Sequence, residues 1–164
     1  MIIRSLEISD AEKFLALNKR VEESGFMLYE PGEKQTTVEQ QRKMIERVSA
    51  EERTIFFVAE REGELAGFIA AFGGTVRRKS HSAYLVLGVD EKFRGQGVAT
   101  QLFHRVFDWA NEKEITRLEL TVIKTNIHAF NLYRKMGFVI EGEKVHSLKI
   151  NGEYVNEYYM YKLL

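Results

Sequence analysis

The residues with the clearest chemical potential form a short stretch, Arg94-Gly95-Gln96-Gly97, directly before a segment with helical periodicity. Backbone N–H groups in the first turn of a helix have no intrahelical partner, and the helix dipole places partial positive charge there. Glycines allow an anion as large as a pyrophosphate to approach these amides closely. The stretch therefore predicts an anion site, with the guanidinium of Arg94 as a fixed positive charge beside it.

Two other interpretations of this loop remain open at this point. A dinucleotide-binding loop of the G-x-G-x-x-G type has a third glycine where this chain has Thr100, although Glu119 follows at a suitable distance for a ribose contact. That type of loop also follows its strand immediately, whereas five residues, DEKFR, separate the apolar run 83–89 from Gly95. The second interpretation is a plain connection between a strand and a helix.

Other common catalytic and metal-binding patterns are absent from the sequence. The chain has no cysteine, which excludes disulfides, thiolate–metal sites and a cysteine nucleophile. The four histidines, at positions 81, 104, 128 and 146, do not have the spacing of a metal site, so we expect no metal. No Gly-x-Ser-x-Gly sequence is present, which argues against a serine hydrolase.

The composition is typical of a globular protein with one core. For 164 residues, of which 45% are hydrophobic and 29% charged, we expect a single domain over residues 1–164. The 24 basic and 24 acidic residues give a formal net charge of zero, so we expect no nucleic-acid partner. No apolar stretch approaches the length of a membrane span, and residues 1–20 lack a signal-peptide pattern. We therefore expect a cytoplasmic protein with no membrane partner.

The hydrophobic periodicity predicts elements in the order βααβββαβαββ. The predicted strands cover 1–6, 54–60, 64–72, 83–89, 117–123, 138–150 and 153–164, and the predicted helices begin after Ser9 or Asp10, after Thr37, at Val98 and at Asn126. The strand–helix–strand order in the middle implies a parallel pair, and both hairpins are antiparallel. We therefore predict an α/β fold with a single mixed, mostly antiparallel sheet of six to seven strands, a central parallel pair and helices on both faces.

Several local signals support these elements. Thr37 and Gln40 have the capping-box pattern, and Asn151-Gly152 is a strong hairpin signal. The run 83–89 is continuously apolar, which is typical of a strand buried on both faces. Two helices have apolar stripes at helical spacing. These stripes are Val98, Leu102, Phe103, Val106, Trp109 and Ala110 in the first helix, and Ile127, Phe130, Tyr133 and Met136 in the second.

Two motifs together resemble the GNAT superfamily of acyl-CoA-dependent N-acyltransferases. The phosphate loop of that family is Arg/Gln-x-x-Gly-x-Gly/Ala, and the segment 94–99 satisfies it at each position. A second block, 126–138, carries the family's asparagine, the alanine three residues on, and its Leu-Tyr and Gly-Phe pairs. The order of elements matches the family's fold along nearly the whole chain, so the resemblance implies a GNAT-like fold.

The resemblance implies that acetyl-CoA is the cosubstrate. In this family the pyrophosphate lies on the loop amides, and the pantetheine arm pairs like an extra strand with the edge of the strand before the loop. That strand splays from its neighbour, and Gly88 suits a local bulge there. The positions assigned to acetyl-CoA are Leu87, Gly88, Val89, Arg94, Gly95, Gln96, Gly97, Val98, Ala99, Thr100, Asn126 and Tyr133.

The resemblance also implies direct transfer of the acetyl group to an amine, without an acyl-enzyme. Tyr133 has the position of the family's usual general acid and would donate a hydrogen bond to the thiolate leaving group. Full proton transfer is uphill, because a phenol has a pKa of about 10 and a thiol one of about 8.5. Glu119 is the best carboxylate candidate for the base, although it also suits a solvated residue at a strand end. Thr121 replaces a glutamate found in relatives that acetylate protein N-termini, which argues against such a substrate.

The acceptor side is suggested by the segment that covers the acceptor pocket in relatives. Phe26, Tyr29 and Glu30 in this segment would suit a cationic amine, and they would also suit an ordinary surface turn. We expect a primary amine on a small molecule, such as a polyamine, an amino acid or an amino sugar. A protein or peptide amine is the alternative acceptor, and a non-catalytic acyl-CoA sensor is the alternative of another class. The aromatic-rich segment 150–164 predicts either a pocket wall or the edge of a homodimer.

Overall fold

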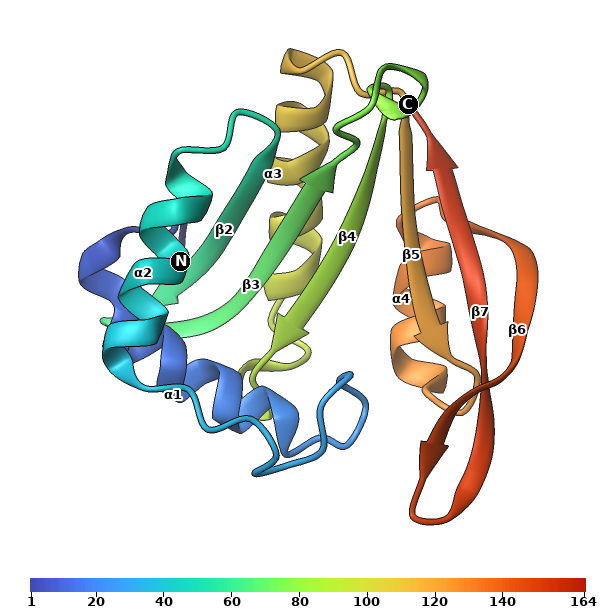
Figure 1. Ribbon diagram of the computed structural model, residues 1–164, viewed down its shortest axis with the longest axis horizontal. Coiled ribbons are helices and arrows are strands. Elements are labelled where there is room, and N and C mark those ends of the chain that lie inside the picture. Colours follow the sequence, from blue (N-terminus) through green and yellow to red (C-terminus); the bar gives the residue numbers. More distant parts are fainter.

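A single seven-stranded sheet organises the computed structural model, which describes all of residues 1–164. Its strand order is β1-β2-β3-β4-β5-β7-β6, and only β4 and β5 pair in parallel (Figure 1). The strands are β1 (Ile2–Ser5), β2 (Thr54–Arg61), β3 (Glu64–Gly73), β4 (Ser82–Val89), β5 (Arg117–Ile123), β6 (Val139–Ile150) and β7 (Glu153–Leu163). The helices are α1 (Ala11–Glu22), α2 (Val38–Ser49), α3 (Val98–Glu112) and α4 (Ile127–Lys135). The predicted fold class is confirmed.

The half of the sheet formed by β1–β4, which we call the four-strand half, is covered on both faces. On the face that we call the front, α1 and α2 pack against it, and the rings of Phe14 and Phe68 lie 5.3 Å apart, edge to face. On the opposite face, the back, α3 packs against alternate residues of the same strands, including Ile69. Because successive strand residues point to opposite faces, β3 is buried continuously over residues 65–71.

The three-strand half, β5–β7, has a core on its back only. Leu118, Leu120 and Val122 of β5 belong to the same buried cluster as residues of α3 and α4. The residues between them, Glu119 and Thr121, face the front, where no helix covers these strands (Figure 1). Polar side chains on this part of the sheet therefore remain accessible.

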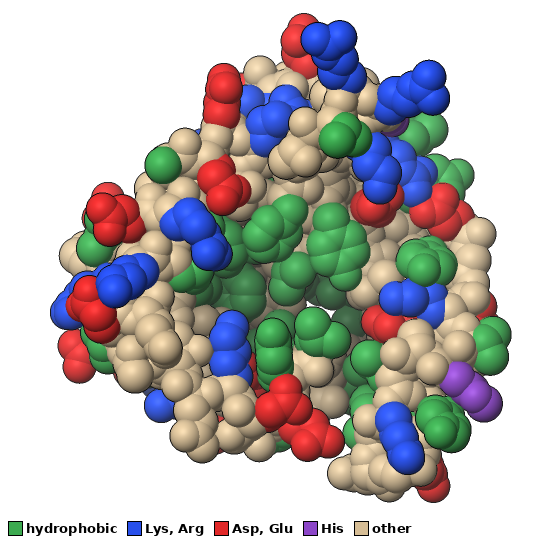
Figure 2. Space-filling view, in the orientation of Figure 1, with side chains coloured by type: hydrophobic (Ala, Val, Ile, Leu, Met, Phe, Trp, Pro, Cys, Tyr) green, Lys and Arg blue, Asp and Glu red, His purple; other side chains and the backbone are tan.

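The two halves meet along a very short parallel pairing. β4 and β5 pair only over residues 82–84 and 117–119, and then diverge (Figure 1). We call the opening between the rest of β4 and the rest of β5 the split. Figure 2 shows a hollow on the front of the molecule at this place, bordered by hydrophobic side chains and with acidic side chains at its lower rim. The splayed strand implied by the family resemblance is present.

Local sequence signals predicted several features correctly. The hydroxyl of Thr37 accepts a hydrogen bond from the N–H of Gln40 at 3.1 Å, and the Gln40 side chain accepts one from the N–H of Thr37 at 2.9 Å. All six residues of the predicted α3 stripe are buried. Asn151 and Gly152 both have positive φ, 51° and 81°, as a two-residue hairpin turn between β6 and β7 requires.

Two predictions about β4 are wrong. The strand is not buried on both faces, because Tyr84 lies on the front at the beginning of the split and is 37% exposed. Gly88 does not form a bulge, since β4 pairs with β3 in continuous register and Gly88 lies opposite Phe68. A Cβ atom at Gly88 would come within 2.5 Å of the Phe68 ring, so the glycine allows close packing instead.

Two helix details also differ from expectation. Ile127 is 59% exposed, because it lies six residues before Tyr133 and therefore about 240° around the helix from it. Asp10 precedes α1 but does not cap it with its side chain. Its carboxylate accepts hydrogen bonds from Arg4 at 2.7 and 2.8 Å instead, which ties the start of α1 to β1.

Three further observations concern the surface. No helix has the length and apolar character needed to cross a bilayer. No group of three or more His, Asp or Glu side chains is arranged to hold a metal ion. The basic run 77–79 forms a short exposed turn before β4, whereas the glycine loop follows β4, so the two lie at opposite ends of that strand.

Candidate functional site

The glycine loop before α3 leaves a run of backbone amides without acceptors. Gly95 and Gly97 both have a left-handed backbone, with φ of 72° and 79°, and Gly97 is the N-cap residue of α3. The first hydrogen bond of α3 joins the N–H of Gln101 to the carbonyl of Gly97, so the amides of residues 95–100 donate to no protein atom. A Cβ atom added at either glycine would meet nothing within 4 Å. The loop is therefore an open cradle of N–H groups suited to an anion.

Several side chains around this cradle are buried or held by hydrogen bonds within the protein. Val98 is buried and holds the start of α3 against the core, while Ala99 and Thr100 are half-buried. The side chain of Gln96 bonds to Arg61 and, at 3.2 Å, to the carbonyl of Lys92, so it is directed away from the amides.

Three basic residues lie beside the cradle. The ammonium of Lys92 lies 3.1 Å from the carboxylate of Glu64, and this ion pair offsets its charge. The guanidinium of Arg61 bonds to the side chain of Gln96 and has no carboxylate partner. The side chain of Arg94 is exposed and unpaired, so its guanidinium remains free to meet an anion at the loop.

The hydrogen-bond pattern of β4 directs two residues into the split. At the end of the β3–β4 ladder the N–H of Asp90 donates to the carbonyl of Ala66 at 2.9 Å. Because such bonds alternate along an antiparallel ladder, the N–H and C=O groups of Leu87 and Val89 point away from β3. Those of Gly88 point toward β3. The free edge of β4 thus offers the backbone groups of Leu87 and Val89 to a ligand.

The facing edge of β5 has the same property. The N–H of Lys124 donates to the carbonyl of Asn156 in β7 at 2.9 Å, and the alternation along this ladder turns the backbone groups of Thr121 and Ile123 toward the split. Neither residue pairs with β4. An extended ligand in the split would therefore find unpaired backbone groups on both sides.

Asn126 lies after the last residue of β5 and begins α4. Its side-chain oxygen accepts a hydrogen bond from the N–H of Ala129 at 3.3 Å, as a helix cap does. The side-chain NH₂ group has no acceptor and remains available to a ligand. A capping role thus coexists with the predicted contact to the cofactor arm.

Tyr133 approaches the split from the back, on α4. Its ring packs edge to face against Phe103 at 5.9 Å and contacts Phe138, and only 8% of the residue is exposed. Its hydroxyl has no hydrogen-bond partner, but it is not sealed off, since the fully buried unpartnered side-chain atoms belong to Gln41 and Ser147.

Burial raises the pKa of the Tyr133 phenol, and the nearby Tyr84 raises it further. A higher pKa widens the mismatch with a thiol, so complete proton transfer to a thiolate becomes less favourable. A neutral phenol that keeps its proton is nevertheless a good hydrogen-bond donor. The environment therefore favours Tyr133 as a donor to developing charge.

Glu119 faces the front beside the split, but its carboxylate is already paired. It accepts a hydrogen bond from the guanidinium of Arg117 at 3.2 Å, and Arg117 also bonds to Glu141 of β6. The Arg117 guanidinium lies over the ring of Tyr161 at 5.1 Å, which fixes it further. The Glu119 carboxylate is therefore part of a structural ion-pair network with Arg117 and Glu141.

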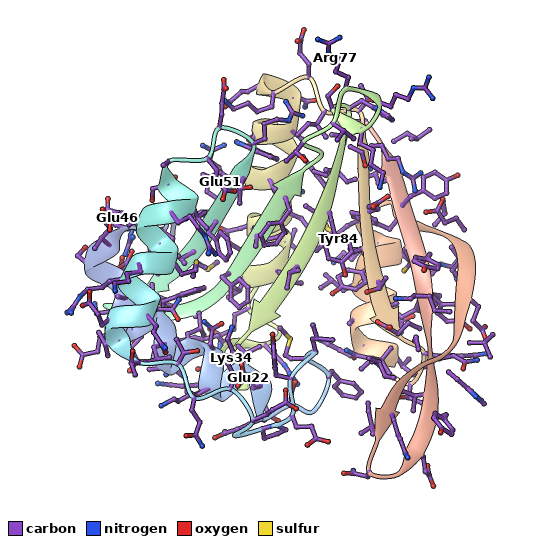
Figure 3. The ribbon with its side chains drawn as sticks, viewed as in Figure 1. Glu22, Lys34, Glu46, Glu51, Arg77 and Tyr84 are labelled. Atoms are coloured by element: carbon purple, nitrogen blue, oxygen red, sulfur yellow. The ribbon has the colours of Figure 1, made fainter.

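Tyr84, which the sequence analysis did not single out, lies between these groups. It occupies the last paired position of β4, and its hydroxyl lies 3.0 Å from the hydroxyl of Thr121 on β5. Figure 3 shows Tyr84 beside the opening between the two strands. The signal that could have found it is its polar hydroxyl in an otherwise apolar strand.

The three predicted acceptor residues all lie at exposed positions in the segment between α1 and α2. Phe26 and Tyr29 are largely exposed, and the ring of Tyr29 lies 5.1 Å from the ammonium of Lys34. Glu30 is exposed, and its carbonyl accepts a turn hydrogen bond from the N–H of Glu33.

Glu22, at the end of α1, is a carboxylate that the sequence analysis missed. It is half-buried, and this burial raises its pKa. Figure 3 shows Glu22 and Lys34 close to the end of β4, below the split.

Comparison with known proteins agrees with this arrangement. A model of the Acetyltransferase (GNAT) family matches residues 19–138. An L-amino acid N-acetyltransferase of Escherichia coli is 37% identical over 101 residues, which are 60% of this chain and 62% of that protein. The spermidine N(1)-acetyltransferase of the same bacterium is 33% identical over 101 residues, 61% of this chain and 53% of that protein. The chain thus matches between about half and two thirds of the length of these two relatives.

Among solved structures, a GNAT-family acetyltransferase from Streptococcus pneumoniae superposes with a TM-score of 0.93. It is 28% identical, and the match covers 99% of each chain. The family model covers most of the chain and includes both the glycine loop and α4. This chain belongs to the GNAT acetyltransferase family.

Proposed function

We propose that this protein is an N-acetyltransferase that moves an acetyl group from acetyl-CoA directly to the primary amine of a small molecule. The observation that carries this proposal is the split itself. It combines a free strand edge, an open cradle of amides at its end and a phenol at its back, and it opens to a hollow on the front.

The residues along the split fit acetyl-CoA. The amides of residues 95–100 and the guanidinium of Arg94 would hold the pyrophosphate, because free N–H groups at a helix start bind phosphate. The backbone groups of Leu87 and Val89 would pair with the amides of the pantetheine arm. The NH₂ group of Asn126 would donate to the same arm. The thioester would then lie near Tyr133.

The chemistry of the transfer assigns one task to Tyr133. The amine nitrogen attacks the thioester carbonyl carbon, a C–N bond forms, the C–S bond breaks, and one proton passes in total from nitrogen to sulfur. Charge therefore develops on sulfur as it leaves. The buried Tyr133 hydroxyl, which has no other partner, would donate a hydrogen bond to this sulfur.

A small amine is the preferred acceptor because of the charges near the front opening. The half-buried carboxylate of Glu22, below the split, suits a cationic amine in this region. The relatives described above act on L-amino acids and on spermidine, which supports a small acceptor in preference to a protein amine. The cytoplasmic location and the homodimer stay predictions.

The test is to follow the release of CoA with a thiol reagent while the protein and acetyl-CoA are mixed with a panel of amines. The panel contains spermidine, the common L-amino acids, an aminoglycoside and a peptide with a free N-terminus. We expect one of the three small-molecule classes to stimulate release. Stimulation by the peptide alone would contradict the small-molecule acceptor, and tight acetyl-CoA binding without any release would indicate a sensor.

The variant Tyr133→Phe extends the same experiment to the catalytic role of the Tyr133 hydroxyl. This change keeps the ring and its packing but removes the donor, so kcat is expected to fall at least about tenfold while the acetyl-CoA Kd stays nearly unchanged. Tyr154→Phe is the matched control, because Tyr154 lies near the tip of the β6–β7 hairpin and is 60% exposed. Equal activity of both variants would remove Tyr133 from catalysis.

A further inference from the structure

The bridge between Tyr84 and Thr121 is the one side-chain hydrogen bond that crosses between β4 and β5. Their hydroxyl oxygens lie 3.0 Å apart. Tyr84 is at the last paired position of β4, whereas Thr121 lies two residues beyond the last paired position of β5. The Tyr84 side chain must therefore reach along the split, and its hydroxyl marks the point at which the strands begin to separate.

The two phenols near the split approach it from opposite faces. Tyr84 and Thr121 are on the front, because Thr121 alternates with the back-facing Leu120 and Val122. Tyr133 belongs to α4, which covers the back. Burial raises the pKa of the Tyr133 phenol, and Tyr84 contributes to this rise. A thioester whose sulfur meets Tyr133 would thus have Tyr84 on its other side.

An amine must enter from the front, since α3 and α4 cover the back. Figure 2 shows the hollow on this front face. Glu119 also faces the front here, but its carboxylate is held by Arg117. The hydroxyls of Tyr84 and Thr121, which bond to each other, are polar groups at the front of the split that no charged partner neutralises.

Thr121 fixes the direction of the lone pairs of Tyr84. A hydroxyl oxygen has one donor hydrogen and two acceptor lone pairs. When Tyr84 donates to Thr121, both of its lone pairs stay free, and when Thr121 donates, one stays free. In either case the Tyr84 oxygen can accept a hydrogen bond from an amine N–H. That bond strengthens as the nitrogen becomes positive during attack.

We propose that the Tyr84 hydroxyl accepts a hydrogen bond from the acceptor amine and thereby directs the lone pair of the amine nitrogen at the thioester. Thr121 is the positioning residue that orients Tyr84. This inference rests on the proposed function and adds the residue that meets the amine. It also gives Thr121 a role of its own, in place of the glutamate that some relatives have at this position.

The experiment compares Tyr84→Phe, Thr121→Val, Thr121→Ser and the double variant Tyr84→Phe/Thr121→Val, using the amine panel described above and acetyl-CoA. We expect Tyr84→Phe to lower kcat/KM for the amine by about tenfold or more, with the acetyl-CoA Kd changed less than about twofold. Thr121→Val is expected to have a smaller effect, and Thr121→Ser, which keeps the hydroxyl, to restore activity. The double variant should be no worse than Tyr84→Phe, because the two residues act through one contact.

Three outcomes would overturn this proposal. If Tyr84→Phe keeps the wild-type kcat/KM, the hydroxyl does not meet the amine. If both single variants weaken acetyl-CoA binding and lower Tm equally, the bridge only holds the strands together. If the double variant loses the product of the two single losses, the residues act separately. Wild-type protein that acetylates no amine would instead overturn the proposed function, and this inference with it.

Discussion

The two halves of the sheet differ in how far their front faces are buried. In the four-strand half, neighbouring strands pair along most of their lengths and aromatic rings fill the front, with Phe14 edge to face against both Phe56 and Phe68. In the three-strand half, the back belongs to the same buried cluster, but the front carries polar residues such as Glu119, Thr121 and the 43% exposed Tyr159. The two halves share the core on the back and differ in what covers the front.

This difference explains why the chemistry lies at the junction of the halves. Unpaired backbone N–H and C=O groups are costly inside a closed core, because they lose their hydrogen bonds to water. The free groups of Leu87, Val89, Thr121 and Ile123 are tolerated because no helix seals the front of the split. A ligand can therefore replace water there without any rearrangement of a packed core.

The largest expected effect on stability comes from comparing one substitution on the front of each half of the sheet. Phe68→Ala, in the four-strand half, should lower the free energy of unfolding by about 3–5 kcal/mol, because it leaves a cavity beside Phe14. Tyr159→Ala, in the three-strand half, should change it by less than about 1 kcal/mol, since its side chain is exposed. Denaturant unfolding of both variants measures the difference. Similar losses would mean that the front of the three-strand half is covered in solution.

A second prediction compares ion pairs in the two halves. Arg4 holds the pKa of Asp10 below its usual range, chiefly through a hydrogen bond. A carboxylate whose pKa is lower in the folded than in the unfolded chain stabilises the fold above its unfolded pKa, and this contribution is lost as the pH falls through the folded pKa. Asp10→Asn should therefore reduce the free energy of unfolding by about 1.5–3 kcal/mol at pH 7. The difference in the free energy of unfolding between variant and wild type should narrow as the pH falls below about 4, because the Asp10 carboxylate is then protonated first in the unfolded chain and at lower pH in the folded chain.

Glu143 in the three-strand half is the matched control for Asp10. Its pKa is also lowered, by hydrogen bonds from Asn156 and Lys124, but it is exposed. We expect Glu143→Gln to leave the free energy of unfolding unchanged at pH 7, because solvent already screens this pair. A difference between Asp10→Asn and wild type that does not narrow at all as the pH falls below about 4 would show that packing, and not charge, explains the Asp10 result.

A third prediction, with a smaller loss of stability than Phe68→Ala or Asp10→Asn, concerns the junction of the two halves. Gly97→Ala places a methyl group in open space within the loop, so its cost to folding is the strain of a positive φ, about 1–2 kcal/mol. Gly152→Ala is matched to it, with φ of 81° and nothing within 4 Å. Both variants should lose similar stability, but only Gly97→Ala should weaken acetyl-CoA binding, by about tenfold or more, since the methyl group blocks the amides. Equal acetyl-CoA affinities would place the anion elsewhere.

Much of the fold could be predicted because its signals are local. The capping box at Thr37, the α3 stripe and the Asn151-Gly152 turn each depend on residues within a few positions of one another. The glycine loop was predicted for the same reason, because helix starts and glycine conformations are properties of a short segment. The packing role of Gly88 was missed because it depends on Phe68 in the neighbouring strand, whereas the exposure of Ile127 follows from its position around its own helix and was missed although it is local.

The candidate site divides in the same way. The sequence by itself predicted the loop that can hold an anion and the helix that carries Tyr133, and the family resemblance implied the free edge of the strand before the loop. Only the tertiary structure decided that β4 and β5 part after three paired residues, that Arg117 forms an ion pair with Glu119, and that the Tyr84 hydroxyl reaches Thr121. The physical reason is that the β4–β5 pairing and the Tyr84–Thr121 contact join residues 35–37 positions apart, where contact depends on how the sheet twists and which faces the helices cover. Arg117 and Glu119 are two residues apart, but Glu141 and Tyr161 of other strands fix the guanidinium between them.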